Sequence, residues 1–288
     1  MSTLKNPFAP FDEALTLAFE ANIRAALEED IGSGDWTAQL VPATTMVTAN
    51  VIAREPAVLC GAPWFEGVMS QVDPRLHIDW RVAEGDHLPA QAEVCRIHGP
   101  ARSLMTAERA ALNFLQLLSA VATATRDVVR LIDGTRAAIL DTRKTLPGIR
   151  LAQKYAVRVG GGKNQRLALY DGILIKENHI AAAGSIAAAM AAARALNAGV
   201  SIQIEVENLD ELRQALEANA ESILLDNFTT AQMREAVHMT AGRAILEASG
   251  GVNRDTVRAI AETGVDRISI GSLTKDIRAI DYSMRVQG

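Results

Sequence analysis

The sequence predicts an α/β protein whose second half is a parallel barrel or a doubly wound parallel sheet. Short, almost wholly apolar segments recur there, each ending in a polar or charged residue and followed by a helical pattern. They cover residues 137–141, 172–176, 202–207, 222–226, 244–249 and 267–272. The terminal residues Lys176, Glu205, Asp226 and Glu247 are spaced by 29, 21 and 21 residues, about one strand-and-helix unit each. Apolar strands in consecutive units of this kind build parallel sheets.

The segments between these strands have helical patterns with recognisable ends. Asn208 is a suitable N-cap for the second of them, and Gly264 suits the end of the last. The predicted helices cover residues 185–196, 209–218, 230–240 and 254–263.

The first half has a different pattern and predicts a separate α+β domain. An amphipathic helix is expected first, then three strands, then one long helix or two shorter ones. These elements cover residues 11–29, 46–54, 76–82, 93–98 and 103–132. We therefore expect a domain at 1–119, an α/β barrel domain at 120–275, and a C-terminal helix at 276–288 that packs back on the first domain.

Composition excludes several classes of protein. The chain has 288 residues, of which 49% are hydrophobic and 22% charged, as in a globular protein with a full core. A net charge of −5 and only 4% aromatic residues argue against nucleic acid as the main partner. No leader or membrane-spanning run is apparent, and Cys60 and Cys95 lack metal spacing. We expect a cytoplasmic protein with reduced structural thiols.

The segment 141–179 is a basic island in this acidic chain. It contains eight cationic and three acidic residues, a net +5 (eight minus three), which leaves −10 for the remainder. Such an island indicates an anionic ligand. Three consecutive glycines, 160–162, could turn their backbone amides toward an anion. Of its cations, Arg150, Lys154 and Arg158 are expected on an intervening helix, in solvent or at a partner subunit, and Lys163 borders the site.

Charged side chains at the carboxyl ends of strands are candidates for the site, because active sites of parallel α/β folds lie there. Arg143 and Lys144 follow a strand and can grip carboxylate or phosphate groups; the alternative is a solvated loop. Arg166 and Lys176 flank the next strand. Glu205 and Asp226 can bind Mg²⁺ through water or hold ribose hydroxyls, or form a structural ion pair with those cations. Glu207 is a weaker candidate.

Two glycine-containing loops complete the candidate site. Ser249-Gly250-Gly251 and Gly271-Ser272 follow the last two strands, where backbone amides at helix N-termini can bind phosphate. Ordinary tight turns are the alternative. His179 could donate to a carboxylate, or could be structural.

Eight motifs along nearly the whole chain resemble those of the quinolinate phosphoribosyltransferase family. They are EDIGSGDWT (29–37), TAERAALNFLQLLSAVAT (106–123), DTRKTLPGIRLAQKYAVRVGGGKNQR (141–166), LIKENHI (174–180), IEVEN (204–208), LLDNF (224–228), LEASGGV (246–252) and ISIGSLT (268–274). The resemblance implies an incomplete TIM-like α/β barrel with an N-terminal α+β sandwich domain.

The resemblance also implies a reaction. Quinolinate and phosphoribosyl pyrophosphate would give nicotinate mononucleotide, pyrophosphate and CO₂, with Mg²⁺ as cofactor, in a homodimer or higher oligomer with shared sites. Lys144, Lys176, Glu205 and Asp226 would be catalytic, and the last two would hold the metal. The residues expected to bind substrate are Arg109 of a partner subunit, Thr142, Arg143, Lys144, Arg166, Lys176, His179, Glu205, Asp226, Ser249, Gly250, Gly251, Gly271 and Ser272. Much of the family has His before the arginine at 166, whereas this chain has Gln165, which cannot be cationic.

Three alternatives stay open on the sequence alone. One is the related phosphoribosyltransferase of molybdenum-transport operons, although the full set of cations favours quinolinate. Another is a catalytically silent dicarboxylate- or phosphate-binding protein, which would gain nothing from facing carboxylates at 205 and 226. The third is a structural oligomer whose basic island pairs with the acidic remainder.

Overall fold

The computed structural model describes residues 3–287, in two compact units. The first unit combines the chain up to Arg126 with residues 145–161 and the chain from Leu273 onward. The second consists of residues 127–144 and 162–272. These bounds differ from the contiguous domains expected from the sequence, because segment 145–161 contributes Ala152, Tyr155 and Ala156 to the core of the first unit.

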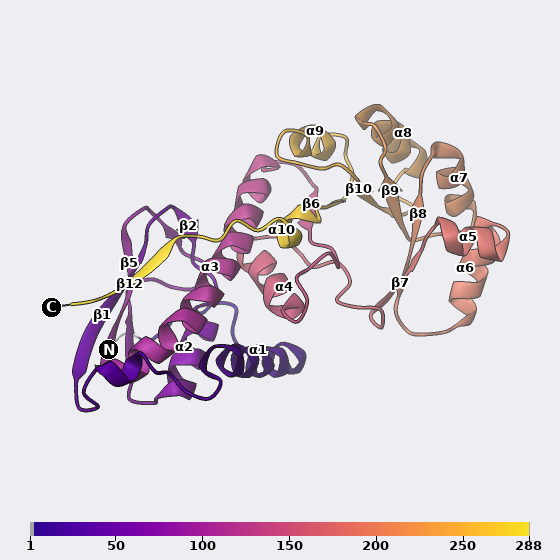
Figure 1. The fold of residues 1–288 in the computed structure, drawn as a ribbon. Helices are drawn as coiled ribbons and strands as arrows, with labels where there is room; N and C mark the ends of the chain where they lie inside the picture. Colours follow the sequence, from indigo (N-terminus) through magenta and orange to yellow (C-terminus); the bar gives the residue numbers. More distant parts are fainter. Residues whose placement is uncertain (1–2, 288) are drawn as a thin grey trace. The chain divides into compact units, whose positions relative to one another are not determined.

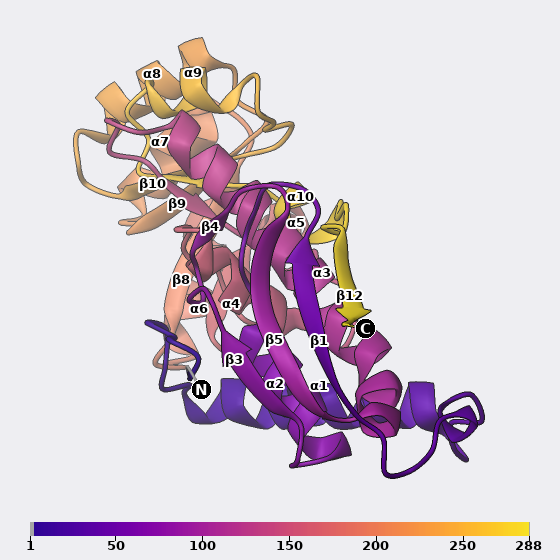
Figure 2. The same cartoon turned by 90° about the vertical axis from the view of Figure 1, so that its left-hand side faces the viewer.

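The first unit contains a four-stranded antiparallel sheet in the order β12-β1-β5-β3 (Figure 2). Every second residue of β1 from Ala49 is buried, as expected for a strand with one face on a core. A separate pair, β2 and β4, is antiparallel as well. The strand bounds are β1 Met46–Ala53, β2 Ala57–Val58, β3 His77–Trp80, β4 His87–Leu88, β5 Ala92–Pro100 and β12 Tyr282–Val286.

The C-terminal segment corrects one prediction. Residues 276–288 were expected to form a helix, but Tyr282–Val286 is strand β12, paired with Ala49–Ala53 of β1. Residue 288 lies outside the described part. As a strand, this segment supplies hydrogen-bond partners to the backbone N–H and C=O groups along the edge of β1. The Tyr282 hydroxyl, buried beneath this strand, hydrogen-bonds to the Ser119 hydroxyl at 2.9 Å.

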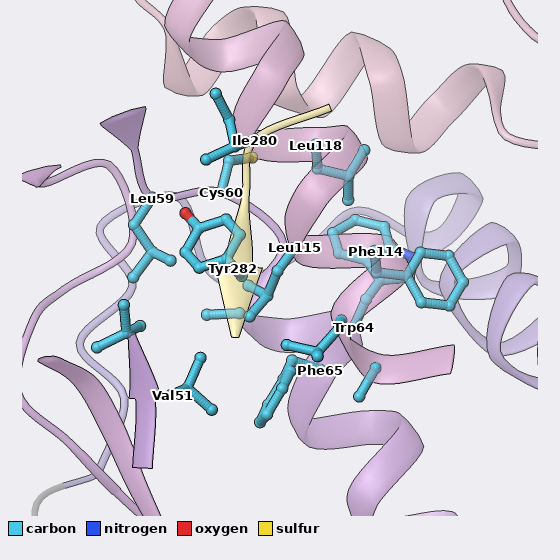
Figure 3. Close-up of a cluster of buried hydrophobic side chains, with 14 of the residues drawn as sticks. Val51, Leu59, Cys60, Trp64, Phe65, Phe114, Leu115, Leu118, Ile280 and Tyr282 are labelled. Carbon is cyan, nitrogen blue, oxygen red and sulfur yellow. The ribbon is translucent and has the colours of Figure 1, made fainter. Parts of the chain in front are cut away.

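Helices pack against this sheet around a core rich in large apolar residues. Figure 3 shows Trp64 and Phe65 of one helix and Phe114, Leu115 and Leu118 of another in this cluster. Trp64 also lies 5.3 Å from the Tyr155 ring, centroid to centroid; aromatic pairs of this kind add about 0.5–1.5 kcal/mol to burial. The helices of this unit are α1 Glu13–Ile31, the 3₁₀ helix η1 Ala38–Leu40, α2 Ala62–Val72, α3 Ala101–Leu131, whose last residues belong to the second unit, α4 Arg150–Val159 and, from Leu273 onward, α10 Ser272–Lys275.

Glu84 is a carboxylate inside this core. Its oxygens accept the backbone N–H groups of Gly61 and Ala62, at 2.8 and 3.1 Å, and the Tyr155 hydroxyl at 3.0 Å. Gly61 is the N-cap of α2 and has no side chain to cap it, so Glu84 supplies the missing acceptor. Burial raises the pKa of Glu84 to about 7, against the lowering effect of these hydrogen bonds.

Gly160 and Gly161, the first two of the three consecutive glycines, end helix α4 with their amides bonded to its carbonyls. The amides of Gly160 and Gly161 already bond to helix carbonyls, at 2.9 Å each. A Cβ atom on Gly160 would lie 2.6 Å from the Ala122 carbonyl oxygen of α3. The Arg126 guanidinium donates to the carbonyls of residues 159 and 160, which caps α4. The sequence interpretation of an anion-binding glycine run was therefore wrong for these two amides.

Lys154 corrects a second prediction about the basic island. It was expected in solvent or at a partner subunit, but it is 1% exposed on α4. Arg158, four residues on, is exposed as expected, with its guanidinium 5.9 Å from the centre of the Tyr155 ring. Lys154 and Arg158 are four residues apart on one helix, and this spacing alone did not predict which of the two side chains is buried.

The second unit contains a parallel sheet of six strands in the order β6-β11-β10-β9-β8-β7. Figure 1 shows α6 to α9 in a row along the outer side of the strands. Within the described residues the edge strands β6 and β7 are not paired with each other, which confirms the incomplete barrel. An isolated bridge joins Leu140 of β6 to Lys163, which precedes β7. The element bounds are β6 Ala138–Leu140, β7 Gly172–Ile175, α5 Glu177–Ala183, α6 Ile186–Ala195, β8 Ser201–Val206, α7 Leu209–Glu217, β9 Ser222–Asp226, α8 Thr230–Thr240, β10 Ile245–Ser249, α9 Val257–Ala261 and β11 Arg267–Ser269.

We expect Glu84→Gln to flatten the pH dependence of stability. The pKa of this carboxyl group is about 7 in the folded protein and 4.5 for a free glutamate side chain, so the group holds its proton more tightly in the folded state. The stability that this proton contributes is fully present below the pKa of the unfolded state. It is lost as the pH rises through the pKa of the folded state. Between pH 5 and 7 the unfolding free energy of the parent should therefore fall relative to that of Glu84→Gln, by at most about 1.4 kcal/mol per pH unit.

Urea denaturation at several pH values measures this difference. Glu217→Gln, an exposed carboxylate on α7, is the control and should run parallel to the parent. Parallel curves for Glu84→Gln and the parent would mean that Glu84 titrates alike in both states.

Candidate active site at the carboxyl ends of the parallel strands

The loop after β6 brings two predicted residues, Thr142 and Lys144, against Gly271 in the loop after β11. The Thr142 hydroxyl accepts the Lys144 backbone N–H at 3.0 Å, which turns the chain directly after the strand. A Cβ atom on Gly271 would lie 3.0 Å from the Lys144 Cδ and 3.4 Å from the Thr142 hydroxyl oxygen. Gly271 thus leaves room for the lysine stem. Ser272, the next residue, begins α10.

Lys176 and Glu205 form an ion pair at the ends of β7 and β8. The ammonium lies 2.7 Å from Glu205 Oε2 and 3.0 Å from Oε1. The lysine side chain is 44% exposed, whereas that of the glutamate is 10% exposed. The pair was one alternative weighed for these residues. Its open side faces solvent, so an arriving anion can compete with Glu205 for the ammonium.

His179 has a structural function in this arrangement. Its Nδ1 accepts the backbone N–H of Lys176 at 3.0 Å, which with the helix end forms a capping box at the start of α5. The bond fixes the backbone of Lys176 where β7 ends. Glu207, the weaker candidate, is exposed and accompanies the start of α7, its N–H bonded to Glu211.

The register of the parallel sheet places Glu205 and Asp226 on one face. Glu205 is paired with Leu224 in β9, and Asp226 lies two residues further along the same strand. Because alternate residues of a strand share a face, both carboxylates point the same way. Asp226 is paired in turn with Ser249 of β10, which adds the serine to this face.

The loop after β10 needs glycine at position 250. A Cβ atom there would lie 2.1 Å from the Asn227 Oδ1, and Gly250 and Gly251 have φ values of +94° and +61°. Both values favour glycine. Helix α9 begins only at Val257, so this loop presents a turn and not the first turn of a helix. The amide of Asn227 also donates to Asp226, at 2.9 Å.

Arg143 and Arg166 are two guanidinium groups close enough to repel. Burial lowers the pKa of Arg166, and the Arg143 cation lowers it further, while Asp171 and Glu247 oppose this. The Nε atoms of both arginines are buried and have no hydrogen-bond partner among the described residues. Arg166 Nη1 donates to the Gly172 carbonyl at 3.0 Å, so its side chain lies by the start of β7 and not at a carboxyl end.

Cavities lie on both sides of this region. One of about 580 Å³ is lined by Gln165, Arg166 and Gln203 together with residues that begin the strands. Another, of about 200 Å³, lies beside Glu205 and is lined mostly by acidic residues. The Arg166 side chain thus lies in the interior by the start of β7, within range of the Arg143 charge, while Lys176, Glu205 and Asp226 lie at or near the carboxyl ends of their strands.

Polar residues inside the sheet were missed by the sequence analysis. Gln203 is 6% exposed and Glu247 is fully buried. Gln203 Nε2 donates to Glu247 Oε2 at 2.9 Å, although β9 separates their strands. The signal was present: Gln203 and Glu205 alternate with isoleucine in β8, so both face the same interior.

The carboxylates were tested as a magnesium site. No group of three or more metal-ligating side chains was found among the described residues. Glu205 and Asp226 supply two carboxylates on one face, and Mg²⁺ is often bound by one or two carboxylates plus phosphate and water. The donor set fits an ion that arrives with a phosphate substrate.

Three remaining findings concern the rest of the chain. Arg109, expected to enter the site of a partner subunit, is exposed on α3 in the first unit. Cys60 and Cys95 are both free and buried, and burial raises their pKa values well above the usual range. Of the helices in the described residues, none combines the length and apolar character needed to span a bilayer.

Comparison with known proteins gives a consistent result over the whole chain. Models of the N-terminal and C-terminal domains of quinolinate phosphoribosyl transferase match residues 35–119 and 121–285. The probable nicotinate-nucleotide pyrophosphorylase [carboxylating] of Bacillus subtilis is 41% identical over 259 residues, 90% of each chain. That of Mycobacterium leprae is 42% identical over 269 residues, 91% of this chain and 95% of the relative.

Solved structures agree. The nicotinate-nucleotide pyrophosphorylase of Francisella tularensis is 44% identical over the full length of both chains, with a TM-score of 0.90. NadC of Streptococcus pyogenes, 36% identical, covers 97% of this chain and 99% of its own with a TM-score of 0.92. The chain belongs to the quinolinate phosphoribosyltransferase family.

Proposed function

We propose that this chain binds quinolinate and phosphoribosyl pyrophosphate along the inner face and carboxyl ends of its parallel strands. As a member of its family, it is a decarboxylating pentosyltransferase of NAD biosynthesis. Phosphoribosyl transfer to quinolinate gives nicotinate mononucleotide, pyrophosphate and CO₂. The proposal assigns the steps of this reaction to named side chains.

The pair Arg143 and Arg166 carries the proposal. Two buried guanidinium edges without a described partner would be costly in a finished interior. Quinolinate has two adjacent carboxylates, each able to accept two parallel N–H bonds. One dicarboxylate between these arginines would satisfy both Nε atoms and remove the repulsion that lowers the pKa of Arg166.

Phosphoribosyl pyrophosphate needs cations and backbone amides for its phosphates. Lys144 lies against Gly271 and supplies a point charge there. The turns at Ser249–Gly251 and Gly271–Ser272 supply amides without side chains in the way. Ser272 of the second turn begins helix α10, whereas α9 begins only at Val257, so the first turn offers its amides from a loop.

The ribose and the leaving group are assigned to Glu205, Asp226 and Lys176. The carboxylates of Glu205 and Asp226 can accept ribose hydroxyls. An incoming phosphate competes for the Lys176 ammonium, which is half exposed in its pair with Glu205. Substrate binding would thus exchange one ionic contact for another and leave no buried charge unpaired.

The chemistry needs no protein nucleophile. The quinolinate ring nitrogen forms a bond to the anomeric carbon as the carbon–oxygen bond to pyrophosphate breaks and its electron pair leaves with the oxygen. The ring, now cationic, accepts the electron pair released when the 2-carboxylate leaves as CO₂, and a proton from solvent replaces it. The side chains fix the two substrates and offer charge where the transition state needs it.

Magnesium, the shared dimer and the compartment are also proposed. Mg²⁺ would be held by Glu205 and Asp226 through water or pyrophosphate oxygens, and it supplies charge neutralisation for the leaving group. Arg109, exposed on α3, would complete the site of a partner subunit in a homodimer. We propose a cytoplasmic enzyme, in keeping with its bacterial relatives.

The direct test is a coupled assay of CO₂ and pyrophosphate. We expect equal amounts of both from quinolinate, and little product from nicotinate, which lacks the second carboxylate for the arginine pair. Chelation of Mg²⁺ should abolish turnover, and adding Mg²⁺ back should restore it. Use of nicotinate as readily as quinolinate would overturn the substrate assignment.

Arg143→Ala should nearly abolish activity. Truncating one partner of a buried charge pair typically costs about 2–5 kcal/mol, roughly 30- to several-thousand-fold in kcat/KM. Steady-state kinetics with quinolinate measure the loss. Arg158→Ala, which removes an exposed cation of the same basic island, is the control and should keep parental kcat/KM. Near-parental kinetics for Arg143→Ala would remove this residue from the site.

Arg109→Ala should be inactive alone yet complement Arg143→Ala. In a mixed dimer one of the two sites would have both arginines intact, so part of the activity should return on mixing. Mass spectrometry of differently tagged subunits confirms that exchange has occurred. Full exchange with no recovered activity would contradict a site shared between subunits.

A further inference from the structure

A chain of hydrogen bonds runs through the interior of the second unit from β10 to Arg166. Gln203 of β8 donates from Nε2 to Glu247 Oε2 at 2.9 Å. Gln165 donates from Nε2 to Gln203 Oε1, also at 2.9 Å. The Oε1 atom of Gln165 accepts the backbone N–H of Arg166. We call this series, Glu247–Gln203–Gln165–Arg166, the amide relay.

The direction of the amide relay is set by its buried end. A carboxylate only accepts hydrogen bonds, so Gln203 must turn its NH₂ group toward Glu247 and its oxygen toward Gln165. Gln165 must then present its own NH₂ group to Gln203, which leaves its oxygen for an N–H donor. The backbone N–H of Arg166 is that donor. Each amide orientation follows from the one before.

The relay joins elements that the sheet itself does not join. Strands β8 and β10 are separated by β9, and segment 162–171 precedes β7 at the far edge. The Gln165 backbone N–H is also bound to Asp141 Oδ1 at 2.9 Å, after β6. The backbone N–H groups of Gln165 and Arg166 are thus tied to buried groups after β6 and, through Gln203, on β8 and β10. The Arg166 guanidinium itself donates to the Gly172 carbonyl.

We propose that Gln203 is a positioning residue for quinolinate: through Gln165 it fixes the backbone of Arg166, and with it the guanidinium that receives a carboxylate. The inference rests on the proposed role of Arg166. Gln203 does not need to touch the substrate. Its removal should affect the binding of quinolinate much more than that of phosphoribosyl pyrophosphate, whose expected contacts lie at Lys144 and the glycine turns.

The surroundings of the relay leave little freedom for a new charge. Charged groups lie around it on several neighbouring segments, and a second carboxylate at 203 would meet Glu247 at hydrogen-bond distance. The groups are Asp141 and Arg143 after β6, Arg166 and Asp171 before β7, Glu205 on β8 and Glu247 on β10.

The first test is Gln203→Met, which keeps the length of the side chain and removes both hydrogen bonds. With about 1 kcal/mol as a typical contribution of one hydrogen bond, loss of one or both bonds predicts a roughly five- to thirtyfold rise in the KM for quinolinate. The KM for phosphoribosyl pyrophosphate should stay within twofold. Gln214→Met, on the exposed side of α7, is the matched control and should change neither.

A charge-preserving exchange provides the rescue. Gln203→Glu places two acceptors face to face, so it should raise the KM for quinolinate more than Gln203→Met does. Adding Glu247→Gln gives the carboxylate at 203 an NH₂ donor on one side and Gln165 on the other, which restores the relay with one interior charge. The double variant should recover most of the quinolinate KM.

Thermal unfolding of each variant separates positioning from folding. If Gln203→Met does not fold, Gln165→Leu breaks the same relay from the loop side and should give the same quinolinate-specific effect. Equal rises in both KM values, a fall in kcat alone, or no rescue in the folded double variant would overturn the proposal. Failure of the parent enzyme to use quinolinate would instead refute the proposed function.

Discussion

Parallel pairing of β8, β9 and β10 fixes which side chains share the inner face of the sheet, and the site follows from that register. Glu205 and Glu247 are both paired with Leu224, and Asp226 is paired with Ser249. Parallel strands present all their carboxyl ends on one side, so polar residues from separate segments meet there. A shift of one residue in any strand would turn its carboxylates to the opposite face.

The interior of the second unit also contains buried polar groups that destabilise it without a ligand. Arg143 and Arg166 keep buried Nε atoms without described partners, and Glu247 has one such oxygen. Each of these groups reduces stability in the free protein. A dicarboxylate can accept hydrogen bonds from the two arginine Nε atoms, although not from the Glu247 oxygen. Cationic groups held in place before the substrate binds need no rearrangement to receive it.

The first unit follows different physics. Its antiparallel sheet has one face on an aromatic core, and several of its buried polar groups bond to one another or to helix ends: Glu84 caps α2, Arg126 caps α4, and Ser119 bonds Tyr282. Segment 145–161, the middle of the basic island, belongs to this unit. Within one motif, Thr142 and Lys144 lie beside Gly271 in the second unit, and the helix after them packs in the core of the first.

The parallel strands, the charged residues at their ends and the family could all be predicted from the sequence alone. Apolar runs of fixed spacing and contiguous motifs are local properties of the chain. The sequence also identified residues that the structure brings together: Thr142, Lys144 and Gly271 at one point, Lys176 and Glu205 at another. Only the tertiary structure decided the C-terminal strand, the burial of Lys154, the packing of Gly160 and the amide relay through Gln203. Each depends on a partner far along the chain, such as the open edge of β1 or a carboxylate two strands away, and a local pattern contains no record of that partner.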